Sequence, residues 1–156
     1  MADAATRRPA PASSMRPFDQ SLPMALLRAR EAVMRGFRRL LREHGLNEQE
    51  WRIMRALREE DPVEIGDLAD RVFILKPSAT RTLRNLEVRG IVSRTRSTAD
   101  QRRTLIALTA EGHRLFDSLA PQSEREYARI AAQIGAGAMD ELYELLGSVT
   151  EALNRG

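Results

Sequence analysis

Nine basic side chains lie between residues 71 and 103, a density that suits contact with a polyanion. Only Glu87 and Asp100 oppose them, so this stretch carries a formal charge of +7, whereas residues 104–156 carry −4. Arginine forks bidentately onto phosphates and guanine edges, and 24 of the 25 Lys and Arg residues of the chain are arginines. The segment therefore predicts nucleic-acid binding. A solvated basic surface is the alternative, and a GC-rich genome would also favour arginine.

A helix over residues 77–89 is expected to carry the central contacts, because Pro77 suits a first turn and Gly90 suits a stop. Its inner face would hold Ala79, Leu83 and Leu86. The outer side and its approach would present Lys76, Pro77, Ser78, Arg81, Arg84 and Asn85, with Thr80 on the flank. In a DNA major groove the arginines would meet guanine or phosphate, and Asn85 would meet adenine. The hydroxyls near the helix start would meet phosphate. An ordinary solvent-exposed helix face is the alternative.

Residues 91–96 and 104–108 alternate like strands, and the polar loop 97–103 would join them as a hairpin. We expect Arg96, Arg102 and Arg103 to contact DNA from this hairpin, because an arginine at such a tip can enter a narrow minor groove. Asp100 would brace an arginine there. A local Asp–Arg pair that only orders the loop is the alternative.

Helical periodicity predicts a long helix from Ser21 to Gly45, further helices over 48–59 and 64–72, and two more after Thr109. The fold is thus expected to be mainly α with a small β-hairpin. A winged helix-turn-helix over 46–108 would lie between helical dimerisation regions over 21–45 and 109–156, and residues 1–20 would form a disordered arm. The last helix carries an apolar stripe suited to dimerisation or to packing within the chain: Leu142, Leu146, Val149 and Leu153.

Three stretches together resemble the MarR family of transcription regulators: GLNEQEWRIMRAL (45–57), PSATRTLRNLEVRGIVSR (77–94) and DQRRTLIALTAEG (100–112). Residues 21–57 further resemble the subgroup that represses homoprotocatechuate (hydroxyphenylacetate) degradation operons. The resemblance implies a homodimer on double-stranded DNA with a pseudo-palindromic operator, with Arg102 in the place of the family's wing arginine. It also implies release by a small aromatic acid such as 4-hydroxyphenylacetate or homoprotocatechuate.

Three residues are candidates for holding such an acid. Arg30 falls on the apolar face of the first helix, where a guanidinium needs a carboxylate partner. That partner would be a ligand, an internal acid such as Glu31 or Glu50, or a residue from the other subunit. His44 would bond a phenol or cap the helix end. Trp51 would stack on an aromatic ring or belong to the core.

Composition excludes several other classes of protein. Without cysteine there are no disulfides, thiol chemistry or cysteine-ligated zinc, and two distant histidines make a metal site unexpected. No P-loop or GxSxG motif and no apolar run of membrane-spanning length is present. We therefore expect a cytoplasmic regulator that is not an enzyme and that uses no cofactor and contacts no membrane. The alternatives are a winged-helix module that binds protein without an effector, or a MarR-type regulator of another ligand class.

Overall fold

The computed structural model of the protein describes residues 15–155, apart from the side chain of Ala136. These residues divide into two compact units, one ending at Met34 and the other beginning at Arg35. Most of the arm predicted over residues 1–20 lies outside the described residues. Its last part contains a 3-10 turn, η1 (Phe18–Gln20), and helix α1 (Leu22–Glu43) begins in the first unit and ends in the second.

The first unit is built around the start of α1. Ser21 caps this helix as predicted, since its Oγ accepts a hydrogen bond from the Met24 backbone N–H (3.3 Å). Asp19 accepts a hydrogen bond from Arg28 Nη1 (2.8 Å), which ties η1 to the helix. Several large apolar side chains remain exposed along this helix: Leu22, Leu26, Leu27 and Val33. The residues that the structure describes thus leave an apolar stripe open here.

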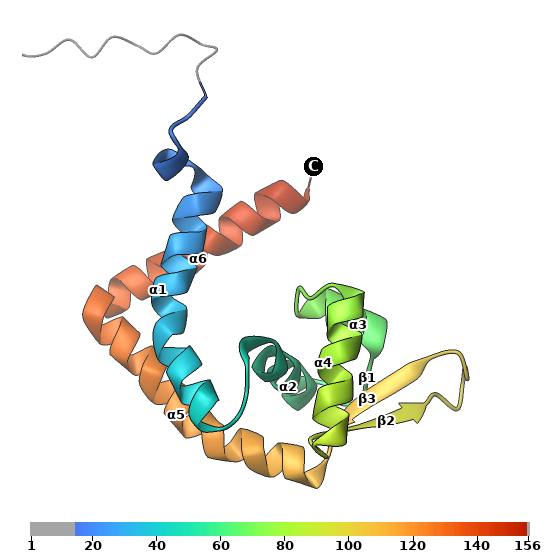
Figure 1. Ribbon diagram of the computed structural model, residues 1–156. Coiled ribbons are helices and arrows are strands. Elements are labelled where there is room, and N and C mark those ends of the chain that lie inside the picture. Colours follow the sequence, from blue (N-terminus) through green and yellow to red (C-terminus); the bar gives the residue numbers. More distant parts are fainter. Residues whose placement is uncertain (1–14, 156) are drawn as a thin grey trace, which may run out of the picture. The chain divides into compact units, whose positions relative to one another are not determined.

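The second unit continues through α2 (Glu48–Glu59), β1 (Val63–Glu64), α3 (Ile65–Arg71), α4 (Lys76–Val88), β2 (Val92–Arg96), β3 (Thr104–Leu108), α5 (Ala110–Ile134) and α6 (Ala136–Asn154) (Figure 1). The predicted bounds of α2 are confirmed, and α4 begins and ends one residue earlier than predicted. Asn47 caps α2 with a full capping box, and Thr109 caps α5. Gly135, at φ 91°, is the single residue between α5 and α6.

The predicted hairpin is confirmed, and a third strand joins it. Strands β2 and β3 pair antiparallel with Val92 opposite Leu108 and Arg96 opposite Thr104. Strand β1 pairs with the other edge of β3, which gives the order β1-β3-β2. A two-residue strand is too short to show alternation, so β1 could not be predicted from sequence. Helix α3 therefore begins after it, at Ile65 instead of at Glu64.

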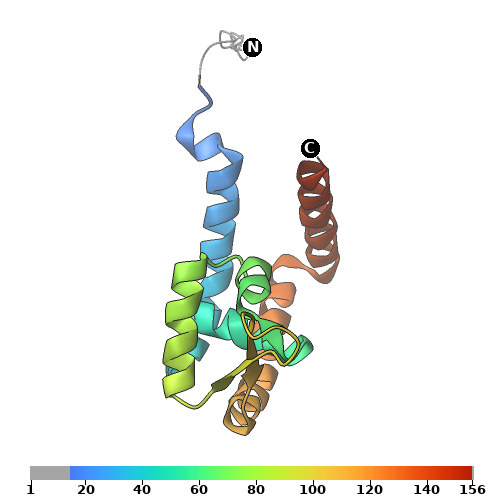
Figure 2. The same ribbon diagram turned by 90° about the vertical axis from the view of Figure 1, so that its right-hand side faces the viewer.

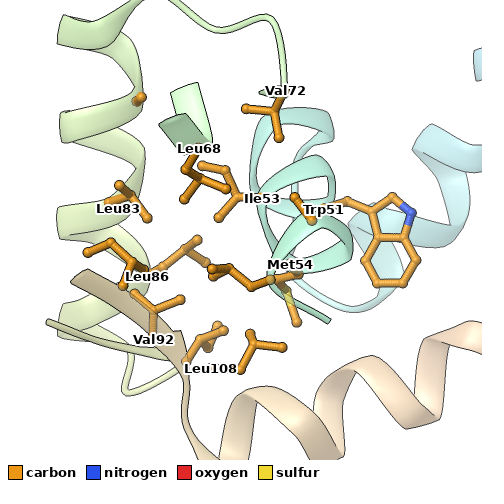
Figure 3. Close-up of a cluster of buried hydrophobic side chains, with 14 of the residues drawn as sticks. Trp51, Ile53, Met54, Leu68, Val72, Leu83, Leu86, Val92 and Leu108 are labelled. Atoms are coloured by element: carbon orange, nitrogen blue, oxygen red, sulfur yellow. The ribbon is translucent and has the colours of Figure 1, made fainter. Parts of the chain in front are cut away.

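The core of this unit lies between α2, α3, α4 and the sheet (Figure 3). Ile53 and Met54 of α2 meet Leu83 and Leu86 of α4, and all four side chains are fully buried. Burying one such side chain stabilises the fold by about 1.5–3 kcal/mol. Because Leu83 and Leu86 point inward, the opposite side of α4 faces solvent, as predicted.

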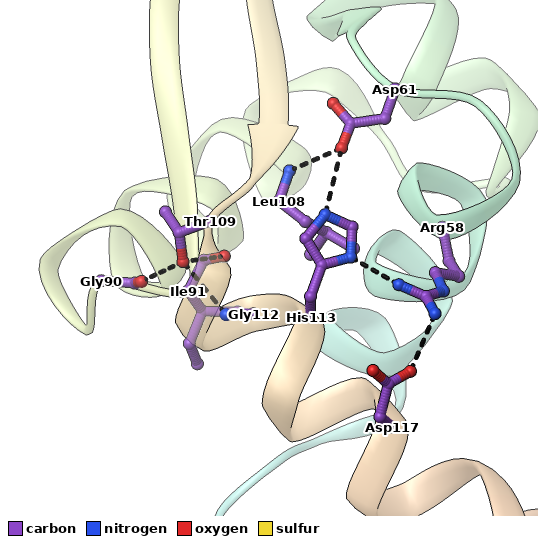
Figure 4. A network of polar contacts seen from close by, with 9 residues as sticks. All are labelled: Arg58, Asp61, Gly90, Ile91, Leu108, Thr109, Gly112, His113 and Asp117. Carbon is purple, nitrogen blue, oxygen red and sulfur yellow. Dashed lines mark hydrogen bonds and ion pairs between the residues drawn. The ribbon is translucent and has the colours of Figure 1, made fainter.

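A polar network fastens the start of α5 beside α2 and the hairpin (Figure 4). The Thr109 hydroxyl donates to the Gly90 carbonyl (2.5 Å), and Asp61 accepts the Leu108 backbone N–H (3.3 Å). Arg58 reaches from α2 to His113 Nδ1 (2.6 Å) and Asp117 (2.9 Å) on α5. These bonds fix the point at which the hairpin passes into the long helix.

Candidate nucleic-acid interface

Helix α4 presents the polar stripe that its sequence predicts. Leu75 precedes it as the N-cap residue and Pro77 occupies its first turn, where a missing N–H costs nothing. Ala79 is buried on the inner side, whereas Pro77, Thr80 and the basic residues are exposed and Ser78 is half-buried. The Thr80 hydroxyl donates to the Lys76 carbonyl (3.0 Å), so its hydrogen is used within the helix.

The basic residues of α4 and the hairpin fall into two groups. Within residues 15–155, no hydrogen bond or ion pair engages the side chains of Lys76, Arg81, Arg84 and Arg102. We call these four residues the unpaired cations. The others are occupied: Arg94 pairs with Glu87 (3.2 Å), and Arg96 donates to the Gln101 carbonyl (3.1 Å). Strand β2 follows α4 and packs on it, so both elements can approach one polyanion (Figures 1 and 2).

Asn85 lies on the exposed side of α4, but its amide is engaged. Its Nδ2 donates to Glu50 Oε1 (2.9 Å), and Glu50 is buried at the start of α2. Glu50 also pairs with Arg89 (3.1 Å), whereas Arg30, the partner considered for it, pairs with Glu31 (3.2 Å). An adenine contact by Asn85 remains a prediction, and it would have to break this internal bond.

The loop of the hairpin is ordered by its own polar groups. Ser97 Oγ accepts the backbone N–H groups of Ala99 and Asp100 (3.3 Å each). Asp100 Oδ1 accepts the backbone N–H of Arg102 (3.0 Å), and the Asp100 carbonyl accepts that of Arg103 (2.9 Å). Asp100 therefore braces the backbone of the tip instead of a guanidinium, and the Arg102 side chain is left exposed.

Arg103 faces the protein. Its Nε and Nη2 both donate to Glu64 Oε2 (2.9 and 2.6 Å), and Asp67 lies 3.7 Å from Nη2. The hydrogen bond and the charge of Glu64 raise the pKa of the Arg103 guanidinium above its usual value. The DNA contact predicted for Arg103 thus competes with a bond that fastens the hairpin to β1.

The three candidate effector residues all have partners inside their own unit. Arg30 is exposed beside Glu31. His44 Nδ1 lies 3.0 Å from the Leu40 carbonyl and its Nε2 lies 3.1 Å from Gln122 Nε2, an arrangement that caps the end of α1. Trp51 is 7% exposed and stacks on Phe116 with ring centroids 5.1 Å apart, as a core residue does. Binding of a ligand by these residues stays a prediction.

A pocket of about 520 Å³ offers a different place for an aromatic acid. It lies between α5, α6 and the α2 side chain Arg55, whose Nη1 donates to the Tyr127 hydroxyl (3.0 Å). Tyr143 and Met139 of α6 add phenolic and apolar groups, and the carboxylate of Glu124 on α5 also lines the pocket. Arg55 and Tyr127 are not among the effector residues that the sequence predicts, because they lie on different helices and only the fold brings them together.

The apolar stripe of α6 lies open to solvent in the single chain. Between 39% and 74% of each side chain is exposed at Leu142, Leu146, Val149 and Leu153. Core packing within the described chain, the alternative considered for this stripe, does not cover it. Among the described residues, no helix is long and apolar enough to cross a membrane.

Comparison with known proteins places this geometry in a family. The MarR family model matches residues 46–104. The homoprotocatechuate degradative operon repressor of Escherichia coli is 44% identical over 126 residues, which cover 81% of this chain and 85% of that protein.

Solved structures show the same similarity over most of the chain. The transcriptional regulator PA4135 superposes with a TM-score of 0.81 at 42% identity, covering 87% of this chain and 98% of that one. NadR in complex with 4-hydroxyphenylacetate superposes with a TM-score of 0.74 at 35% identity, covering 87% and 96%. The winged-helix fold is thus shown by both sequence and structure.

Proposed function

This chain belongs to the MarR family, and we propose on that premise that it is a homodimeric DNA-binding repressor of an aromatic-acid degradation operon. Its operator would be pseudo-palindromic, and a small aromatic acid would release it. The name of the Escherichia coli relative supports the operon class, and the 4-hydroxyphenylacetate bound to NadR supports the effector class.

The observation that carries the DNA-binding role is the group of unpaired cations. Of the nine basic residues between 71 and 103, five are bonded to an acid or a carbonyl. The other four are exposed and bonded to no other side chain within residues 15–155: Lys76, Arg81, Arg84 and Arg102. Arginines left without a partner are available to phosphates and base edges. We place α4 in the major groove as the recognition helix and Arg102 in the adjacent minor groove.

The pocket beside Arg55 supports an aromatic acid as effector. Its guanidinium supplies a charged donor for a carboxylate, and the Tyr127 and Tyr143 rings supply apolar faces and hydroxyls for a phenol. The pocket that Arg39, Arg125 and Arg129 line, about 420 Å³, contains cations but no aromatic ring. We therefore assign the effector to the pocket beside Arg55. The compound 4-hydroxyphenylacetate has both a carboxylate and a phenol, the two groups that this pocket could bond.

The exposed apolar stripes of α6 and of the start of α1 support a homodimer. Large exposed apolar stripes mark interaction surfaces, and the α6 stripe repeats at steps of three and four residues, as helix–helix contacts do. A twofold dimer would present two recognition helices to successive major grooves about 34 Å apart.

Fluorescence anisotropy with labelled DNA from upstream of the protein's own gene tests the proposal. We expect tight binding that weakens steeply between two salt concentrations, because each phosphate contact contributes a slope of about −0.9. Adding 4-hydroxyphenylacetate or homoprotocatechuate should release the DNA. If DNA binding is unchanged by both acids, the effector assignment is contradicted and the DNA-binding role is kept. If the protein does not bind DNA at low salt, a protein-interaction module is favoured instead.

A further inference from the structure

Glu50 is a buried carboxylate that the DNA contacts proposed above do not use. It lies in the first turn of α2, with 2% of its surface exposed. Its Oε2 accepts the Asn47 backbone N–H (2.9 Å) and completes the capping box. Its Oε1 accepts bonds from Asn85 Nδ2 (2.9 Å) and Arg89 Nη1 (3.1 Å) near the end of α4. One side chain therefore joins the start of α2 to the end of α4.

The helix cap alone does not require a carboxylate at this position. Glutamine serves as well as glutamate in a capping box, because one side-chain oxygen is all that the cap needs. A buried charge is costly unless it is paired and hydrogen-bonded, and the cationic partner of Glu50 is Arg89. The other nitrogen of that guanidinium, Nη2, donates to the Gly45 carbonyl (2.9 Å), so Arg89 also holds the turn before α2.

Polar bonds add to the apolar core in holding the two helices together at this end. A pocket of about 520 Å³ opens between the start of α2 and α4, and both Arg81 and Arg84 line it. One further bond crosses beside it, from the Thr82 hydroxyl to Gln49 Oε1 (3.1 Å). Apolar packing of Leu83 and Leu86 fixes the inner face of α4, whereas on the side of this pocket the fine setting of its rotation depends on these bonds. A change in that rotation would displace the guanidinium groups of Arg81 and Arg84.

We propose that Glu50 is a positioning residue that sets the rotation of α4 and thereby aims Arg81 and Arg84 at the operator. It acts through Asn85 and Arg89 and does not touch DNA. The proposal rests on the proposed function, because it takes α4 as the recognition helix. It also accounts for Asn85, which lies on the exposed side of α4 yet turns its amide inward.

The variant Glu50→Gln tests this proposal in the full-length protein, because it keeps the cap oxygen and removes the charge that holds Arg89. We expect operator affinity to fall about tenfold, the size of one lost specific contact. Affinity for unrelated DNA and the salt slope should stay unchanged, because every unpaired cation is still present. Glu126→Gln, which removes another buried carboxylate with an arginine partner, is the matched control and should leave operator affinity unchanged.

A double-mutant cycle separates positioning from direct contact. If Glu50 acts through Arg89, then Glu50→Gln combined with Arg89→Gln should bind no more weakly than Glu50→Gln alone. Additive losses, or a lower salt slope for Arg89→Gln, would mean that Arg89 itself contacts phosphate and would overturn the proposal. Operator affinity that Glu50→Gln leaves unchanged would overturn it as well.

A measurement without DNA keeps this proposal distinct from the proposed function. If the wild-type protein binds no DNA, the proposed function is contradicted. Hydrogen exchange still reports on the bonds from Glu50 to Asn85 and Arg89. We expect Glu50→Gln to speed exchange of the amides at the end of α4 and to leave those of α5 unchanged. If Glu50→Gln fails to fold, the same exchange measurement is made on Asn85→Ala and Arg89→Gln, because both of these residues are exposed. Unchanged exchange in α4 would contradict the proposal.

Discussion

Arg102 and Arg103 are neighbours in the sequence, but their side chains have opposite surroundings. Arg103 forms two hydrogen bonds to Glu64, whereas Arg102 is exposed and unpaired within the described chain. We predict that Arg102→Ala weakens operator binding by about 1–3 kcal/mol, or lowers the salt slope by about 1 if it meets phosphate. Anisotropy titrations at several salt concentrations measure both quantities. Unfolding by urea should be unchanged, and a loss of stability would show that Arg102 has a structural role.

Arg103→Ala should act in the reverse order. Removing its bonds to Glu64 frees the hairpin from β1, so we expect the midpoint of urea unfolding to fall. Operator affinity should fall only indirectly, because the hairpin becomes less ordered. This loss should be smaller than the loss caused by Arg102→Ala. If Arg103→Ala keeps full stability and loses operator affinity, then Arg103 leaves Glu64 to bind DNA, as the sequence analysis predicted.

These two arginines also mark the limit of what the sequence can predict. Periodicity placed both in the same loop and placed Leu83 and Leu86 inside α4, because core patterns follow from local helix and strand geometry. It could not distinguish their partners, since Glu64 lies 39 positions before Arg103. The same holds for Asn85, because its partner Glu50 lies 35 positions away in the sequence. Pairing between distant side chains depends on tertiary packing, which local periodicity does not encode.

The pocket beside Arg55, which we propose for the effector, could not be predicted from the sequence for a related reason. Arg55 and Tyr127 are 72 positions apart and lie on different helices, so only the fold brings them together. The residues selected from sequence, Arg30, His44 and Trp51, were those that stand out on one helix at a time. In the structure each of them has a partner within the protein. Arg30 bonds Glu31, His44 bonds the Leu40 carbonyl, and Trp51 stacks on Phe116.

Arg55→Ala should blunt the response to 4-hydroxyphenylacetate and spare DNA affinity in its absence. Losing a charged hydrogen-bond donor costs about 1.5–3 kcal/mol, so the acid concentration for half release should rise about 10- to 100-fold. Tyr127→Phe should have a smaller effect of the same sign. Arg114→Ala, which removes an exposed arginine paired with its helix neighbour Glu111, is the control. An equal shift in that control would mean that the response follows general charge and would contradict the pocket.

Gly112→Ala should destabilise the protein, because a Cβ there would lie 2.2 Å from the Ile91 carbonyl oxygen. Main-chain atoms at this junction are held by Thr109, so they cannot move aside freely (Figure 4). Overpacking of this kind costs about 1–3 kcal/mol, measurable by urea unfolding. Gly66→Ala is the control, since its Cβ would have ordinary contacts and a better helix former should stabilise by about 0.5–1 kcal/mol.

Acid unfolding should report on Glu126, a buried carboxylate of α5. The hydrogen bond from Arg129 lowers the pKa of Glu126 below its ordinary 4.5, although burial opposes the shift. A lowered folded-state pKa contributes stability above the unfolded value, and this contribution is lost as pH falls through the folded value. Glu126→Gln should therefore be less stable than wild type at pH 7, and the difference should shrink below pH 4.5. Urea unfolding at a series of pH values measures it, with the exposed Glu151→Gln as control. A difference that stays constant down to acid pH would mean that packing, and not charge, carries the contribution of Glu126.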